Sequence, residues 1–164
     1  MASNGQMTGM LGVYLVAAEL SRRNFIVSPT SRGAAGADLL VTDQACTKAW
    51  SVQVKTNRRP SNTWLVGAHA RQMKSDSHVY VFVNLKEIEN QRPDYFVTAS
   101  SWVASHVQDK TRTTGSRWYW FDKKDRPSPD EGWEIFGNPY TLALDASEVE
   151  VSEANDIYKM NEIF

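Results

Sequence analysis

The stretch from His78 to Leu85 constrains the fold of this chain more than any other segment. It reads His-Val-Tyr-Val-Phe-Val-Asn-Leu, so β-branched and aromatic residues follow one another almost without a break. A run of this length and composition is typical of a strand. Strands that are apolar on both faces lie in the interior of a sheet with a layer packed on each side. The segment therefore predicts a central strand of a covered sheet.

The segment from Trp50 to Thr56 predicts a strand with two unlike faces. Apolar and polar residues alternate along it with a period of two. The apolar face consists of Trp50, Val52 and Val54, and the polar face consists of Ser51, Gln53 and Lys55. Shorter strands are expected at 25–27, at 37–42 after a glycine-rich turn, and at 95–98.

Helical patterns flank these strands. Residues 7–24 place Leu11, Leu15 and Ala18 on one stripe that neighbouring apolar residues broaden, so most of this helix is expected to be buried. A short helix is expected within 67–74, and another runs from a cap at Ser100 or Ser101 to about residue 108. The order is then α-β-β-β-α-β-β-α, which predicts an α/β sandwich.

The end of the chain predicts less regular structure. Trp118, Trp120 and Trp133 lie there, and prolines at 127, 129 and 139 interrupt any long element. A chain of 164 residues suits one domain. We expect residues 1–110 to form its core, and residues 111–164 to form an irregular, aromatic-rich extension that packs on this core and ends in an acidic tail.

The charges are divided unevenly along the chain, although the net charge is only −1. Between Arg22 and Lys74 nine basic residues stand against two acidic ones, a net of +7, whereas the chain from Asp122 onward carries −7. A basic half of this size attracts the phosphates of nucleic acid. The alternative is that the two halves face each other in the fold and cancel.

Cysteine content and hydropathy predict where the protein resides. Cys46 is the only cysteine, so the chain forms no internal disulfide and no thiolate zinc site, which is typical of a reducing compartment. The longest apolar run, Met10–Ala18, has nine residues, whereas a membrane helix needs about 20. No basic residue precedes this run, as one would in a secretory signal. We therefore expect a cytoplasmic protein that does not insert into a membrane.

Asp38 and Lys55 are the candidate catalytic pair. Asp38 opens one predicted strand, and Lys55 lies on the polar face of the next. Neighbouring antiparallel strands bring such side chains together, with Gln53 on the same face and the carbonyl of Val54 between them. Oxygen ligands of this kind suit Mg²⁺, and an ion beside a lysine suits phosphodiester hydrolysis. The alternative is an ordinary cross-strand ion pair without a function.

Two segments resemble the core of the PD-(D/E)xK nuclease superfamily, and above all bacterial members whose second motif reads Q-V-K-T. These segments are Gly36-Ala37-Asp38-Leu39-Leu40-Val41 and Ser51-Val52-Gln53-Val54-Lys55-Thr56. Residues 12–20 are similar to the first helix of those proteins, and 79–84 and 94–100 to their later strands, so the likeness covers about residues 9–108. It implies a restriction-endonuclease-like α-β-β-β-α-β sandwich with a mixed central sheet.

The resemblance also implies roles for individual residues. Asp38 is expected to bind Mg²⁺ or Mn²⁺, with Gln53 and the Val54 carbonyl completing the shell, while Lys55 assists the attacking water. Gln53 stands where an acid is usual, and a neutral amide binds Mg²⁺ more weakly than a carboxylate. Many members take another acid from the first helix, where Glu19 is the only candidate. The alternative for Glu19 is a solvated surface position.

These inferences predict metal-dependent hydrolysis of DNA phosphodiester bonds, and an RNA substrate remains open. Candidates for contacts to the nucleic-acid backbone, with a solvated surface as the alternative, are Arg32, Arg58, Arg59 and Lys74. The run 118–121 suits either base stacking or core packing. Many members of the superfamily act as dimers, so a homodimer is one expected assembly. Because Gln53 replaces an acid, the alternative function is an inactive module of the same fold that binds nucleic acid or a protein partner.

Overall fold

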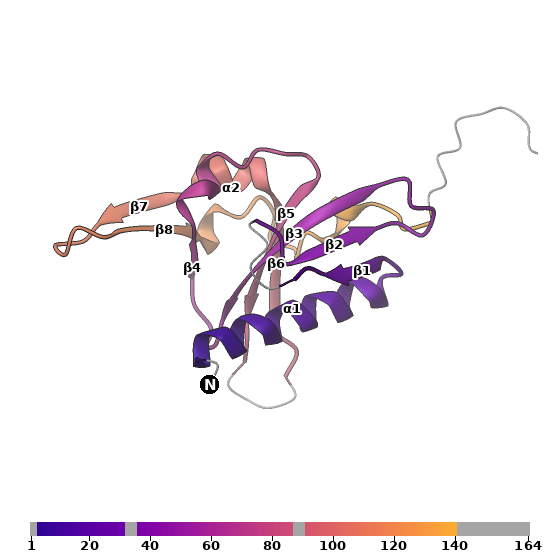
Figure 1. The fold of residues 1–164 in the computed structure, drawn as a ribbon, viewed down its shortest axis with the longest axis horizontal. Helices are drawn as coiled ribbons and strands as arrows, with labels where there is room; N and C mark the ends of the chain where they lie inside the picture. Colours follow the sequence, from indigo (N-terminus) through magenta and orange to yellow (C-terminus); the bar gives the residue numbers. More distant parts are fainter. Residues whose placement is uncertain (1–2, 32–35, 87–90, 141–164) are drawn as a thin grey trace, which may run out of the picture.

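The central feature of the structure is a mixed β-sheet. The computed structural model describes residues 3–31, 36–86 and 91–140. Within these ranges, the strands lie across the sheet in the order β1 (Ile26–Pro29), β2 (Leu39–Thr42), β3 (Ala49–Asn57), β5 (His78–Asn84) and β6 (Asp94–Ala99) (Figure 1). β3 and β5 pair in parallel, and the other neighbours pair antiparallel. The predicted α/β fold with a mixed central sheet is therefore confirmed.

The helix α1 (Asn4–Arg22) packs against one face of this sheet, over β1 and β3. It begins with a capping box in which Ser3 and Gln6 satisfy each other's backbone N–H groups. It ends just before Asn24, whose φ of 64° is incompatible with a right-handed helix. The helix predicted for residues 7–24 is thus present and begins one turn earlier.

The face that α1 buries differs from the predicted stripe. Leu11 and Ala18 are exposed and Leu15 is half-buried, whereas the buried hydrophobic residues are Val13, Val16 and Leu20. The helix carries apolar residues over most of its circumference, so hydropathy alone does not select the stripe. The buried stripe is set instead by the close approach of the helix to β3 at Gly12, which turns the neighbouring Val13 toward the sheet.

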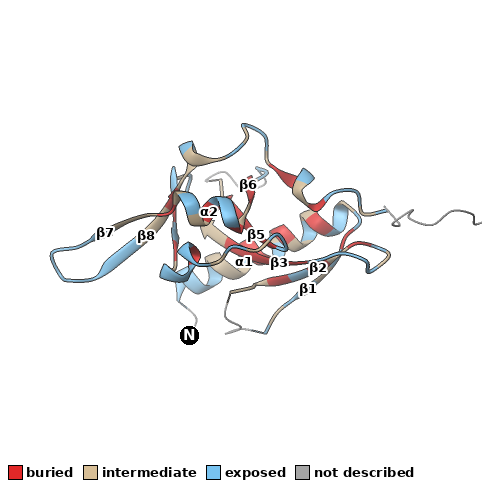
Figure 2. Ribbon diagram, turned by 90° about the horizontal axis from the view of Figure 1, so that it is seen from above, coloured by how far each residue is buried: buried red, intermediate tan, exposed pale blue. Residues whose placement is uncertain are grey.

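A second layer covers the opposite face of the central sheet (Figure 2). As far as the chain is described, it consists of α2 (Ser100–His106), the 3-10 helix η1 (Ala68–Arg71) and an antiparallel sheet of β4 (Thr63–Val66), β8 (Arg117–Asp122) and β7 (Gln108–Thr111). Trp64 and Phe121 from this layer pack on Phe82 of β5. Enclosed between two layers, β5 is buried at every residue, which confirms the prediction of a central strand.

The segment after residue 110 is more regular than expected as far as Asp122. β7 and β8 form a hairpin, and β8 also pairs with β4 from the first half of the chain. Only the short 3-10 helices η2 (Lys123–Asp125) and η3 (Trp133–Phe136) follow among the described residues. The Phe136 ring contacts Phe25 and Trp50 in the core beside α1, so aromatic contacts attach this segment to the core.

The serines expected to cap α2 do not cap it. Its N-cap is Ala99, without a side-chain hydrogen bond. The hydroxyl of Ser100 instead donates to the carbonyl of Ser75 and accepts from the Ser75 N–H, both at 3.0 Å, which ties α2 to the approach to β5. No helix in the described ranges combines the length and hydropathy of a membrane span.

Candidate active site at the edge of the central sheet

Asp38 lies at the point where β2 begins, after a turn that contains Gly36 with a φ of 89°. Its own N–H donates to the carbonyl of Val52 at 2.7 Å, which fixes the backbone against β3. Its Oδ2 atom accepts a hydrogen bond from the N–H of Val54 at 2.8 Å and a second from the side-chain amide of Gln53. The carboxylate is therefore held across the edge of β3 by one backbone donor and one side-chain donor.

Gln53 and Val54 place two further oxygen atoms beside this carboxylate. Gln53 is 8% exposed, and because its amide nitrogen donates to Asp38, its amide oxygen is left to accept from or ligate another group. The N–H and C=O of one strand residue point to the same side, so the Val54 carbonyl faces the edge that its N–H faces. The side of β3 that Asp38 faces therefore offers the Asp38 carboxylate, the Val54 carbonyl and the Gln53 amide oxygen as candidate metal ligands.

Lys55 is half-buried on the same face of β3 as Gln53, two residues along the strand. Burial lowers the pKa of the Lys55 ammonium, and attraction to Asp38 partly opposes this change. The apolar residues of β3 point to the other face, where Val52 and Val54 join the core beside α1. The structure therefore brings Asp38, Gln53 and Lys55 together on one face, as the alternation of the sequence indicates.

The donor set at Asp38 suits one weakly held divalent cation. It offers a single carboxylate, and the described residues contain no group of three or more His, Cys, Asp and Glu side chains able to hold a metal. Mg²⁺ is commonly bound by one or two carboxylates together with water and substrate phosphates. One carboxylate and two neutral oxygens fit that pattern only if a substrate completes the shell.

The structure does not bring Glu19 to this set. Its carboxylate accepts from Arg22 at 3.0 Å and also pairs with Arg23 and Arg92. Despite the burial that opposes it, this pairing lowers the pKa of Glu19. Glu19 also belongs to α1, which packs against the face of β3 opposite to Gln53 and Lys55 and meets this strand at Thr56. The first helix therefore contributes an ion-pair cluster here and no acid to the candidate site.

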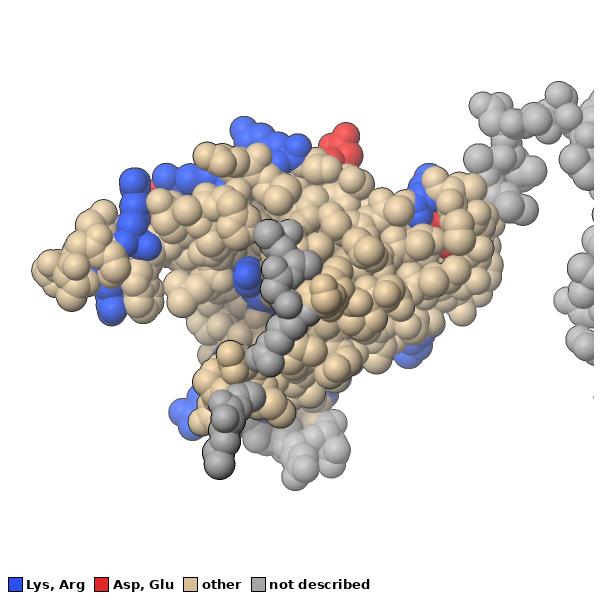
Figure 3. Space-filling view, in the orientation of Figure 1, with Lys and Arg blue, Asp and Glu red and all other residues tan. Residues whose placement is uncertain are grey.

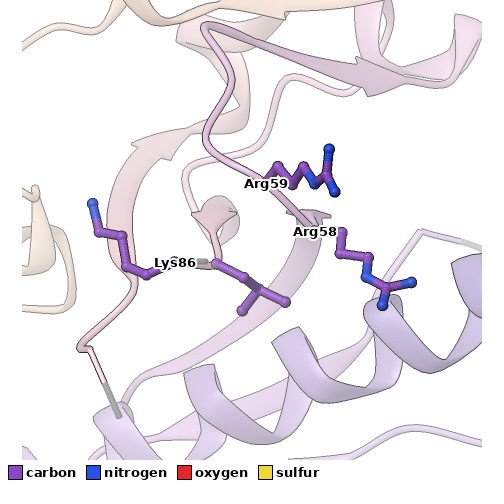
Figure 4. Close-up of a pocket in the computed structure, with 4 residues that line it drawn as sticks. Arg58, Arg59 and Lys86 are labelled. Carbon is purple, nitrogen blue, oxygen red and sulfur yellow. The ribbon is translucent and has the colours of Figure 1, made fainter. Parts of the chain in front are cut away.

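Basic side chains outnumber acidic ones on the face of the molecule shown in Figure 3. Arg58 and Arg59 follow β3 and line an open cleft of about 410 Å³ with Leu85 and Lys86, which follow β5 (Figure 4). Arg58 and Lys86 point in different directions from this cleft, and Lys86 pairs with Asp94. The parallel pairing of β3 with β5 places these strand ends together.

The remaining predicted contacts are dispersed. Lys74 is exposed beyond η1, and Arg32 lies outside the described residues. Lys86 is not among the predicted residues, because the parallel pairing that brings it beside Arg58 joins segments that are far apart in the sequence. In the sequence, Lys86 follows directly on the apolar run His78–Leu85, and this position is the signal that places it at the end of a central strand.

Comparison with known proteins gives a limited likeness. No protein-family model matches the chain, and no curated protein matches it significantly. Among solved structures, the chain is similar to Hjc from Archaeoglobus fulgidus, a Holliday junction resolvase from an archaeal hyperthermophile. The TM-score is 0.47 and the sequence identity 11%, over 73% of this chain and 87% of Hjc. A likeness at this level does not establish a family.

Proposed function

We propose that this protein is a metal-dependent nuclease that hydrolyses phosphodiester bonds of DNA at the site formed by Asp38, Gln53, Val54 and Lys55. The observation that carries the proposal is the fixed carboxylate of Asp38, which receives hydrogen bonds from Gln53 and from the Val54 N–H while Lys55 lies on the same face. An isolated cross-strand ion pair needs neither the buried amide nor the backbone donor. The hydrogen bonds from the Gln53 amide and the Val54 N–H therefore support a site in which the Asp38 carboxylate is held in a fixed orientation to bind a ligand.

The oxygen atoms of this site would hold Mg²⁺ or Mn²⁺. Asp38 supplies the charge, and the Val54 carbonyl and the Gln53 amide oxygen supply neutral ligands. When bound, such an ion polarises a phosphate oxygen and lowers the pKa of a water molecule. Gln53 orients Asp38 through its amide nitrogen, so the same side chain serves as a positioning residue and as a ligand.

Lys55 would supply positive charge where negative charge develops on the phosphate. Because the ammonium is partly removed from water, its interaction with a phosphate oxygen is stronger than that of a solvated lysine. The lowered pKa makes the ammonium a stronger acid, so its proton is easier to transfer to a leaving group. The basic bias of residues 22–74, which include this site, supports a polyanionic substrate.

Cleavage of supercoiled plasmid tests the proposal. The assay compares wild-type protein, Lys55→Met and Asp38→Asn with Mg²⁺, with Mn²⁺ and with EDTA. Lys48→Met is the matched control, because Lys48 is an exposed lysine that lies just before the same strand. We expect cleavage by wild type and by the control with metal only, and a loss of about 100-fold or more in the two site variants.

Each alternative gives a distinct result in this assay. Cleavage that persists in Lys55→Met and Asp38→Asn at the wild-type rate contradicts the proposed site. DNA binding without cleavage by any of the four proteins supports the alternative function, an inactive module of the same fold.

A further inference from the structure

The outer part of the β7–β8 hairpin, residues 110–118, extends beyond the rest of the second layer (Figures 1 and 2). Its strands pair from Gln108 opposite Trp120 to Thr111 opposite Arg117, and the Arg112 N–H continues the ladder to the carbonyl of Ser116. All residues from 110 to 118 are exposed. A ribbon that stands clear of the core contributes little to the core, so its side chains require a separate explanation.

The two faces of this hairpin differ in charge and in contacts. Directly paired residues point to the same face, and the face alternates along each strand. One face carries Asp109, Tyr119 and Arg117. Asp109 pairs there with Arg117 and with Arg71 of η1, and Arg71 also lies over the Tyr119 ring, 5.3 Å from its centroid. Ion pairs and ring contacts thus attach this face to the body of the protein.

The opposite face carries Lys110, Arg112 and Trp118, and it is open. Trp118 is 41% exposed, and the guanidinium of Arg112 lies 4.0 Å above its ring. In the described parts of the chain neither Lys110 nor Arg112 pairs with an acid, unlike Arg117 on the other face. The open face therefore presents two uncompensated positive charges around an aromatic plane, a composition that suits phosphates flanking a base or sugar.

From this asymmetry we infer that the β7–β8 hairpin is a DNA-binding arm whose open face enters the major groove of a B-form duplex. The major groove is about 12 Å wide and admits a two-stranded ribbon. The four residues of β7 span about 13 Å, enough to reach across its depth of about 8.5 Å. In A-form RNA this groove is narrow and deep, so the ribbon favours DNA. The inference rests on the proposed function and adds the form of the substrate and the element that holds it.

Equilibrium binding of a short fluorescein-labelled DNA duplex, measured by anisotropy in EDTA, tests the arm without any cleavage. The variant Lys110→Ala/Arg112→Ala removes two charges from the open face. The control Arg22→Ala/Lys48→Ala also removes one exposed arginine and one exposed lysine and changes the net charge equally, although Arg22, unlike Arg112, pairs with Glu19. We expect the arm variant to bind about tenfold more weakly than the control, and the slope of its logarithmic salt dependence to fall by about 0.9 for each phosphate that it no longer neutralises. Trp118→Ala should weaken binding further by removing an apolar contact in the groove, and Trp118→Phe should restore part of it.

The outcomes separate this inference from the proposed function. If both double variants bind the duplex equally well while wild type cleaves plasmid, the DNA-binding role of the hairpin is refuted and the nuclease proposal stands. If the arm variant alone loses binding while no protein cleaves, the arm stands and the nuclease proposal fails. Tighter binding of wild type to a duplex RNA of the same sequence than to the DNA also contradicts the arm, because an A-form groove does not admit it.

Discussion

Gly12→Ala should destabilise the protein relative to Gly9→Ala, although both changes replace a glycine with alanine in the same helix. A Cβ atom on residue 12 would lie 2.8 Å from the Cβ of Thr56 and still closer to its hydroxyl oxygen, whereas a Cβ on residue 9 meets nothing within 4 Å. Either change gains about 1 kcal/mol of helix propensity. Overpacking at residue 12 costs about 1–3 kcal/mol, so the two variants should differ by that amount in the free energy of unfolding.

Urea unfolding of both variants measures this difference. With an m-value of about 2 kcal/mol per molar, the midpoint of Gly9→Ala should exceed that of Gly12→Ala by about 0.5–1.5 M. Gly12→Ala should also lower the rate of plasmid cleavage, because Thr56 follows Lys55 on β3 and any shift of α1 moves this part of the strand. Equal midpoints for the two variants would refute the close approach of α1 to β3.

Two further changes probe the candidate site, and a third probes the ion-pair cluster at Arg92. Burial lowers the pKa of Lys55, so the folded protein binds fewer protons than the unfolded chain as pH rises toward 10.5. The stability of wild type relative to Lys55→Met should therefore rise as the pH approaches 10.5 in urea unfolding, and a flat difference would contradict the burial. Gln53→Glu supplies a second carboxylate and should raise the affinity for Mn²⁺ roughly tenfold in titration calorimetry, whereas an unchanged affinity would place Gln53 away from the ion. The hydrogen bond from Arg92 lowers the pKa of Glu131, so this pair stabilises the fold above about pH 4.5 and the stabilisation is lost as pH falls. Arg92→Gln should therefore raise the pKa of Glu131 and shift acid unfolding, measured by circular dichroism, to higher pH. An acid transition at the wild-type pH would show that the pair contributes nothing to stability.

Features that depend on near neighbours in the sequence could be predicted. The alternation over 50–56 and the apolar run from His78 specify two strands and their faces without long-range information. Asp38 and Lys55 share a face because their strands are adjacent in the sequence and pair antiparallel. The candidate site follows from period-two geometry and one short connection, which is why sequence and structure agree there.

Features that depend on distant segments could not be predicted. β4 pairs with β8, more than fifty residues later, and this pairing makes residues 117–122 regular, although they belong to the segment expected to be irregular. The same pairing separates the aromatic run, so that Phe121 is buried in the core while Trp118 is exposed on the hairpin. The position of Glu19 depends on where α1 lies along β3, and that register is set by tertiary packing at Gly12.

The binding of an ion at Asp38 is the central claim, and anomalous scattering from a crystal soaked in Mn²⁺ tests it most directly. We expect a Mn²⁺ peak in direct contact with the Asp38 carboxylate and the Val54 carbonyl, with the Gln53 amide oxygen turned toward it, and no such peak in Asp38→Asn. A Mn²⁺ peak bound elsewhere, with the edge between β2 and β3 empty at saturating metal, would contradict it.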